Sequence, residues 1–154
     1  MGQPGLEHTA GGRTLAAMSA AITHRVTIDE IDAAGVMFAG TICTLAHRAY
    51  EQVLHHVGLD LAEMVRAGGI ALPLRALHAD FRRPIHHGHE LNISVAVAER
   101  RDHGYRVQIT IAEATGGDVL AVIEQVHACL GPAGTKCALP ATVLGALDRL
   151  PMVG

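Results

Sequence analysis

The sequence predicts an α+β fold in which an antiparallel sheet carries one long helix, and two observations indicate it. Apolar residues alternate with polar ones up to Ile28, follow a helical period from Thr41 to Val57, and alternate again after Gly69. Glycine-containing turns separate the later alternating segments, as turns between antiparallel strands do. We therefore expect the order strand, long helix, short helix and four strands, with the main helix inserted after the first strand.

The first strand and the long helix follow directly from the positions of apolar residues. The strand is predicted from the alternation of three residues with polar neighbours: Ile22, Val26 and Ile28. The helix is predicted over Thr41–Val57 from five residues on one helical stripe: Ile42, Leu45, Ala49, Val53 and Val57. Gly58 is placed to end this helix, because glycine readily adopts the left-handed conformation found after helix C-termini.

A short helix and the remaining strands complete the predicted sheet. Asp60 can cap the short helix, with Glu63 three residues later as in a capping box. Strands are then expected around Leu91–Val97 and Tyr105–Ile111, where apolar residues occupy every second position. Residues 119–130 are apolar at nearly every position, which is typical of a strand covered on both faces.

Glycine and proline divide the chain into three parts. Residues 1–20 hold no long apolar run and are expected to be a flexible tail without a signal peptide or membrane helix. Residues 21–130 form the predicted domain, and residues 131–154 form an extension with a short helix between Pro140 and Pro151. The predicted sheet curls around its long helix and leaves open edges, so a homodimer is the expected assembly.

Composition excludes several classes of function. The chain has 154 residues and a formal net charge of -3, which offers no broad positive surface for nucleic acid. Its three cysteines have no C-x-x-C spacing, so neither a disulfide framework nor a zinc knuckle is expected, and a reducing cytoplasm is the simplest compartment. A membrane is not expected among the binding partners of this chain.

A carboxylate in the loop before the long helix is the first candidate for chemistry. Asp32 lies among small residues a few positions before the helix start, where free backbone N–H groups and the helix dipole favour negative charge. The N–H groups of Ala39 or Gly40 can hold a developing oxyanion while the carboxylate faces the reacting carbon. On spacing alone, Asp32 is as readily a loop cap or an ion-pair partner of Arg25.

The same loop resembles the 4-hydroxybenzoyl-CoA thioesterase branch of the hotdog-fold superfamily, and within it the 1,4-dihydroxy-2-naphthoyl-CoA thioesterases. The resemblance covers about residues 21–130 and rests on these segments: Asp32-Ala-Ala-Gly-Val36, Ala-His-Arg-Ala-Tyr-Glu at 46–51, Ala-Leu-Pro-Leu at 71–74, and Asp80-Phe-x-x-Pro84 followed by Gly88 and Leu91. It implies a hotdog fold, an antiparallel sheet wrapped around a long central helix. It also implies that Asp32 is the catalytic carboxylate of an acyl-CoA thioester hydrolase, active as a homodimer or homotetramer with its pockets at the dimer interface.

The resemblance also implies roles for other residues. Ala39 supplies the main-chain N–H that polarises the thioester carbonyl, although most relatives carry an aromatic residue or His at this position. Gly35 and Phe38 belong to the substrate-binding loop. Arg100 and Arg101 align with residues that contact the phosphates of coenzyme A, and Arg101 is the better match. Arg82 and Arg83 are the second choice for this role. The alternative for Arg100 and Arg101 is a hairpin tip that is simply charged.

The expected substrate is an aromatic acyl-CoA, with 1,4-dihydroxy-2-naphthoyl-CoA ahead of 4-hydroxybenzoyl-CoA and a short or branched aliphatic acyl-CoA after them. Asp32 acts either as nucleophile or as general base on water, and the sequence does not choose between these roles. A hydratase of this fold would pair its Asp with a His about five residues later, where this chain has Met37. A non-catalytic acyl-binding protein is the other alternative.

Eleven histidines raise the question of a metal site. The cluster His86-His87-Gly88-His89 has no acidic or Cys partner at a recognised spacing, so a solvated turn is predicted, with neither metal nor cofactor. His47 and Glu51, in the long helix segment shared with the family, can approach the site, and Glu51 is as readily a surface or dimer contact.

Overall fold

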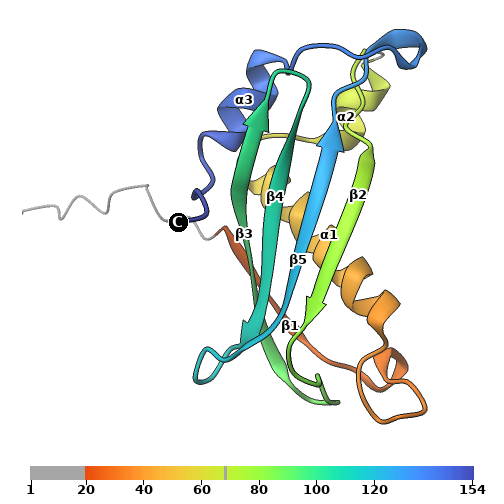
Figure 1. Cartoon of the computed structure of the whole chain (residues 1–154), viewed down its shortest axis with the longest axis vertical. Coiled ribbons are helices and arrows are strands. Elements are labelled where there is room, and N and C mark those ends of the chain that lie inside the picture. The colour runs from red at the N-terminus through yellow and green to blue at the C-terminus, as the bar shows by residue number, and fades with distance from the viewer. Residues whose placement is uncertain (1–19, 68) are drawn as a thin grey trace, which may run out of the picture.

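The structure, a computed structural model, describes residues 20–67 and 69–154 and confirms the predicted α+β class and hotdog fold (Figure 1). The predicted tail of residues 1–20 lies outside the described residues except for Ala20. The helices and strands are β1 (Ala21–Arg25), α1 (Ala39–His56), α2 (Leu61–Arg66), β2 (Leu74–Phe81), β3 (Glu90–Arg101), β4 (Gly104–Glu113), β5 (Val119–Ala128) and α3 (Ala141–Leu147). Two 3₁₀ turns, Ile28–Glu30 and Pro132–Gly134, complete the set.

The five strands form one antiparallel sheet in the order β1-β3-β4-β5-β2, and α1 crosses one of its faces (Figure 1). Side chains alternate between this face and the opposite one, so every second residue of β3, β4 and β5 is buried against the helix. The helix contributes the other half of the core: Ile42, Leu45, Ala46, Ala49, Tyr50, Val53 and Leu54.

Both predicted helices occur, with one correction at an end. α1 begins at Ala39 rather than Thr41. It ends at His56 with Val57 as the C-cap, and Gly58 terminates it as predicted, since its φ of 90° permits two closing bonds, Gly58 N–H to His55 O and Leu59 N–H to Leu54 O. Asp60 caps α2 as predicted, because its carboxylate accepts a 2.9 Å hydrogen bond from the backbone N–H of Glu63.

Two strand predictions are corrected. The first strand stops at Arg25 because the chain turns into a 3₁₀ segment, which leaves Ile28 70% exposed rather than on a sheet face. The prediction that residues 119–130 are covered on both faces is also wrong for the single chain. β5 alternates buried with half-buried side chains after its first residues, since α1 packs on only one face of the sheet.

The C-terminal residues pack on the same core as the sheet. Val143, Ala146 and Leu147 of α3 are fully buried. Beyond α3, the backbone N–H of Val97 donates to Pro151 O and that of Val153 donates to Val97 O. No helix in the described ranges is long and apolar enough to cross a membrane.

β2 is a sheet edge with an apolar row. It hydrogen-bonds to β5 on one side only, and most of its side chains are exposed. Leu77 and Phe81 are 40% and 47% exposed and, with Ala79 between them, lie on the face that carries the buried residues of β5, since β-ladder partners share a face.

Candidate active site

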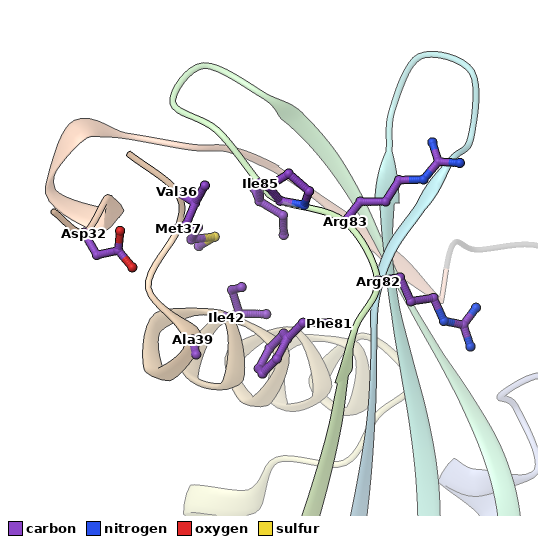
Figure 2. A pocket seen from close by; sticks show the side chains of 10 residues that line it. Asp32, Val36, Met37, Ala39, Ile42, Phe81, Arg82, Arg83 and Ile85 are labelled. Atoms are coloured by element: carbon purple, nitrogen blue, oxygen red, sulfur yellow. The ribbon is translucent and has the colours of Figure 1, made fainter. Parts of the chain in front are cut away.

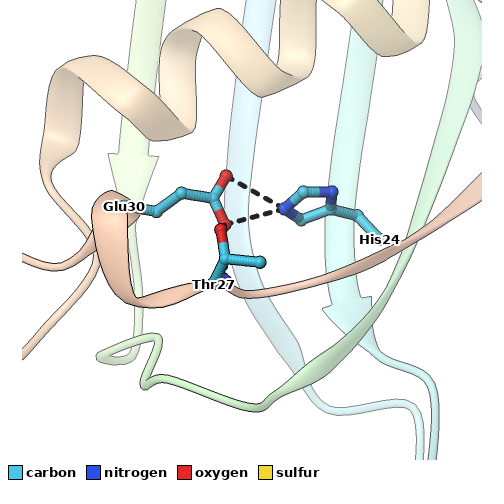
Figure 3. Close-up of polar contacts among 3 residues, drawn as sticks. All are labelled: His24, Thr27 and Glu30. Atoms are coloured by element: carbon cyan, nitrogen blue, oxygen red, sulfur yellow. Dashed lines mark hydrogen bonds and ion pairs between the residues drawn. The ribbon is translucent and has the colours of Figure 1, made fainter.

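A small hydrogen-bonded turn fixes the start of the loop that carries Asp32 (Figure 3). The Glu30 carboxylate accepts from the Thr27 backbone N–H at 2.8 Å, and both of its oxygens lie 2.9 Å from His24 Nε2. Burial is the largest influence on the pKa of Glu30 and raises it, but the hydrogen bonds from Thr27 and His24 together outweigh burial and hold the pKa below its ordinary value. Glu30 is therefore a charged anchor for the loop.

The loop itself is a tight turn closed by its own backbone. The Asp32 N–H donates to Val36 O at 2.9 Å, and the Gly35 N–H donates to Asp32 O at 3.0 Å. Gly35 has a φ of 80°, a left-handed conformation that glycine adopts without strain. Two further bonds, from Phe38 N–H to Glu30 O and from Met37 N–H to Ile85 O, fasten the loop to its surroundings.

The Asp32 side chain is half-buried, and the turn uses only one of its two carboxylate oxygens. Its Oδ1 accepts a 2.8 Å hydrogen bond from the Ala34 N–H, so the carboxylate does cap its own turn. Arg25, the ion-pair partner considered from the sequence, binds Glu90 instead. The second oxygen, Oδ2, has no protein partner among the described residues and is available for chemistry.

The N-terminus of α1 supplies free donors beside this carboxylate. Among residues 20–67 and 69–154, the backbone N–H groups of Ala39, Gly40 and Thr41 have no acceptor, as expected for the first turn of a helix. Gly40 fits closely here, since an added Cβ would lie 2.7 Å from the Phe38 ring. The site thus pairs a carboxylate with helix N–H groups that stabilise negative charge.

Asp32 and the start of α1 open into one cavity of about 310 Å³ (Figure 2). Its lining residues come from the loop, from α1 and from the end of β2: Asp32, Val36, Met37, Ala39, Ile42, Phe81, Arg82, Arg83, Pro84 and Ile85. The walls are mainly apolar, with Asp32 on one side and the two arginines on the other. Such a cavity suits an apolar ligand that carries a reactive polar group.

The structure brings together some predicted site residues and separates others. Asp32 and Ala39 line the cavity, whereas Phe38 lies outside its lining and is 57% exposed. The sequence assigned no site role to Ile42 or Ile85, which are both buried and line the same cavity as Asp32. Ile42 carried a signal, its place on the apolar stripe of the helix, but that stripe does not distinguish a pocket wall from core.

Arg100 and Arg101 do not reach this cavity within one chain. They end β3 at the α3 end of the sheet, and the Asp32 loop lies at the opposite end, roughly 35–40 Å away for a twelve-residue strand (Figure 1). Arg100 binds Asp148 and donates to Leu147 O at 3.0 Å, so it fastens α3. Arg101 binds Glu99 through two bonds of 2.8 and 3.1 Å.

Arg82 and Arg83, second in order from the sequence, lie at the cavity instead. Their side chains extend outward from its rim, away from Asp32 (Figure 2). Arg82 pairs with Asp80 and Arg83 with Asp118, and all four side chains are about half exposed or more. Exposed pairs of this kind contribute little to stability, so both arginines can exchange partners readily.

The histidines occupy two different settings. In the turn at 86–89, His86 Nδ1 lies 3.2 Å from Gly35 O and ties this turn to the Asp32 loop. No group of three or more His, Cys, Asp or Glu in the described part of the chain is arranged to hold a metal ion. His47 points inward to Gln125, while Glu51 lines a surface groove between α1 and α2 and does not line the Asp32 cavity.

Comparison with known proteins relates the chain to thioesterases. The model of the Thioesterase-like superfamily matches residues 26–147. A 1,4-dihydroxy-2-naphthoyl-CoA hydrolase of Synechocystis is 29% identical over 117 residues, which cover 75% of this chain and 85% of that protein. One from Picosynechococcus is 27% identical over 141 residues, covering 88% and 97%. The crystal structure of a 1,4-dihydroxy-2-naphthoyl-CoA thioesterase from Synechocystis superposes with a TM-score of 0.78 at 27% identity, covering 83% of this chain and 94% of that one.

Proposed function

The chain belongs to the Thioesterase-like superfamily, and we propose from this that it is an enzyme that hydrolyses an acyl-CoA thioester to the free acid and coenzyme A. The observation that carries the proposal is the convergence of the Asp32 carboxylate and the α1 N-terminus on one apolar cavity. The relatives named as 1,4-dihydroxy-2-naphthoyl-CoA hydrolases favour an aromatic acyl group, with that ester as first choice.

The free donors of α1 perform the electrostatic part of the reaction. When the carbonyl carbon is attacked, its oxygen becomes an oxyanion, and the Ala39 and Gly40 N–H groups are positioned at the helix start to hold it. The helix dipole adds to this effect in the same direction. Because the donors are fixed backbone groups with no other acceptor in the described part of the chain, they need no rearrangement as charge develops.

Asp32 performs the bond-making part by one of two routes. As nucleophile, its free oxygen attacks the carbonyl carbon, the C–S bond breaks with loss of the CoA thiolate, and water then hydrolyses the mixed anhydride to restore the carboxylate. As general base, it takes a proton from a water molecule that attacks the same carbon. Both routes use one water and release one acid and one thiol.

The rim arginines offer a charge-matched place for the phosphates of coenzyme A. Arg82 and Arg83 stand across the cavity from Asp32, and their present partners are exposed carboxylates that a phosphate can replace. Arg101 keeps its predicted phosphate role only if another subunit brings it to this cavity, because one chain holds it at the far end of the sheet. Arg100 is already engaged with α3.

A homodimer, with a homotetramer as the larger alternative, fits the exposed edge of the sheet. Within the described residues, β2 has no strand partner along one side; it exposes Leu77 and Phe81, and Phe81 also lines the cavity. A second subunit seated on β2 would pair the edge and cover the cavity at once. The compartment that suits the free thiols of Cys43, Cys129 and Cys137 is the reducing cytoplasm.

Thiol release from a panel of CoA esters tests the proposal. The purified protein is incubated with 1,4-dihydroxy-2-naphthoyl-CoA, 4-hydroxybenzoyl-CoA and short aliphatic acyl-CoA esters, and free CoA is measured with a thiol-reactive dye. We expect turnover, fastest with an aryl ester. If none of the esters releases thiol, an enzymatic function is refuted and an acyl-binding protein is favoured.

A further inference from the structure

Gln125 of β5 is fully buried and has one amide atom without a partner. It lies beneath α1 with its Oε1 at 3.3 Å from both His47 Nδ1 and His127 Nε2, while its Nε2 has no hydrogen-bond partner among the described residues. An unpaired buried amide group is costly, since it gives up its bonds to water without replacing them.

The protons of His127 decide which way the amide faces. His127 is buried against the rings of Tyr50 and Tyr105, whose centroids lie 4.4 and 5.3 Å from its own, and its Nδ1 lies 3.0 Å from Leu72 O, which can only accept. Burial lowers the pKa of His127 to about 4, so at neutral pH the ring is neutral and carries one N–H, on Nδ1. His127 Nε2 is then an acceptor.

An acceptor at His127 Nε2 must meet the NH₂ group of Gln125 rather than its oxygen. Turning the amide by 180° exchanges these two atoms without changing its shape. After this turn, Gln125 Nε2 donates to both His127 Nε2 and His47 Nδ1. Because His47 Nδ1 then accepts, the ring N–H of His47 lies on its Nε2. The pair of Gln125 and His47 is left with one free acceptor, Gln125 Oε1, and one free donor, His47 Nε2–H.

The pair lies at the end of an apolar seam that begins at the Asp32 cavity. On α1 the seam follows Ala39, Cys43 and His47, which share a face at four-residue spacing and span about 12 Å. On β2 it follows Phe81, Ala79 and Leu77, and Leu77 is the register partner of Gln125. His47 and most of these side chains are only partly buried, so the seam borders the open edge of the sheet.

We propose that Gln125 and His47 recognise a ring hydroxyl of the acyl group, which donates to Gln125 Oε1 and accepts from His47 Nε2–H. This inference rests on the proposed thioesterase function. The side chains named between the Asp32 cavity and the pair, Cys43, Ala79 and Leu77, are apolar, so a ring lying along the seam finds its polar partners at the pair. An acyl group without the hydroxyl leaves both polar atoms unpaired, and a site of this kind discriminates strongly against such analogues.

Matched CoA esters test the inference in the wild-type enzyme. The specificity constants kcat/KM for 3- and 4-hydroxybenzoyl-CoA are compared with that for benzoyl-CoA, and those for 1,4-dihydroxy-2-naphthoyl-CoA with 2-naphthoyl-CoA. We expect a hydroxylated ester to be preferred about 10- to 100-fold. In the para position a ring hydroxyl donates electrons and slows attack at the carbonyl, so a preference for 4-hydroxybenzoyl-CoA over benzoyl-CoA reports binding rather than reactivity.

A variant then assigns the preference to the pair. Gln125→Met keeps the size of the side chain and removes its polar atoms. It should lower kcat/KM for the preferred hydroxylated ester at least 10-fold. The kcat/KM for the matching ester without a hydroxyl should change less than 3-fold. Gln108→Met, on the opposite face of β4, is the matched control and should leave the ratio unchanged. If Gln125→Met does not fold, the same comparison is made with His47→Phe, at the partly exposed end of the pair.

The outcomes separate this inference from the proposed function. Hydrolysis of all esters with no preference for a hydroxyl would overturn the inference and leave the thioesterase function standing. An equal loss for both esters in Gln125→Met would also overturn it, because a purely structural role acts on both. No hydrolysis of any ester would refute the proposed function itself.

Discussion

Replacing Ala39 with proline removes one proposed oxyanion donor while leaving the helix intact. Ala39 is the first residue of α1, a position where proline is common because its N–H has no helical acceptor. Phe38, with φ of -62° and ψ of 133°, already has the extended conformation that a following proline requires. Stability should therefore change little, within about 0.5 kcal/mol.

The expected effect on catalysis is large. Loss of one oxyanion donor typically lowers kcat by about 10²- to 10³-fold, or roughly 2.7–4 kcal/mol of transition-state stabilisation. The assay is steady-state thiol release from the best aryl-CoA ester, with Tm measured in parallel. Ala39→Ser, which retains the N–H, is the control and should stay near wild-type activity. A folded Ala39→Pro enzyme within threefold of wild type would refute the role of this N–H.

Three further predictions concern pH, assembly and coenzyme A. The folded-state pKa of His127, lowered to about 4, lies below the unfolded value of about 6.5, so unfolded chains bind more protons between these pH values. The free energy of unfolding from urea titrations should fall by up to about 3 kcal/mol as the pH drops from 7 to 4, and His127→Asn should flatten this slope; an unchanged slope would contradict a neutral buried ring. Leu77→Asp, on the exposed β2 edge, should shift the protein to monomers in size-exclusion chromatography, while Leu144→Asp on α3, equally exposed in one chain, should not; a dimeric Leu77→Asp protein would exclude this edge as the interface. Replacing Arg82 and Arg83 together by Gln should raise KM about 10-fold for CoA esters and leave it unchanged for an N-acetylcysteamine thioester, which lacks the phosphates; equal effects on both esters would argue against phosphate binding.

Local patterns in the sequence predicted the scaffold because each depends on near neighbours. The positions of Gly58 and Asp60 gave the end of α1 and the start of α2 through backbone conformation and capping. The end of the first strand was predicted too late, since Ile28 continues the alternation but the Thr27–Glu30 capping turn redirects the chain. Short-range chemistry thus outweighed a period-two pattern.

The site was predictable only where it is contiguous in the chain. Asp32 and Ala39 lie seven residues apart and share the loop and helix start, so spacing and family resemblance both pointed to them. Gln125 comes to His47 across 78 residues through the packing of β5 under α1, and no local pattern encodes that contact. Arg100 and Arg101 show the converse, because their sequence neighbourhood does not reveal that β3 carries them to the far end of the sheet.

The role of Asp32 is the central claim, and the kcat of Asp32→Asn for the best aryl-CoA ester tests it most directly. Asparagine keeps the shape and the capping acceptor for the Ala34 N–H but is neither a nucleophile nor a base. We predict that kcat falls at least about 10³-fold while Tm and the elution volume of the assembly stay at wild-type values. A folded Asp32→Asn enzyme that retains more than a tenth of wild-type kcat would contradict the account.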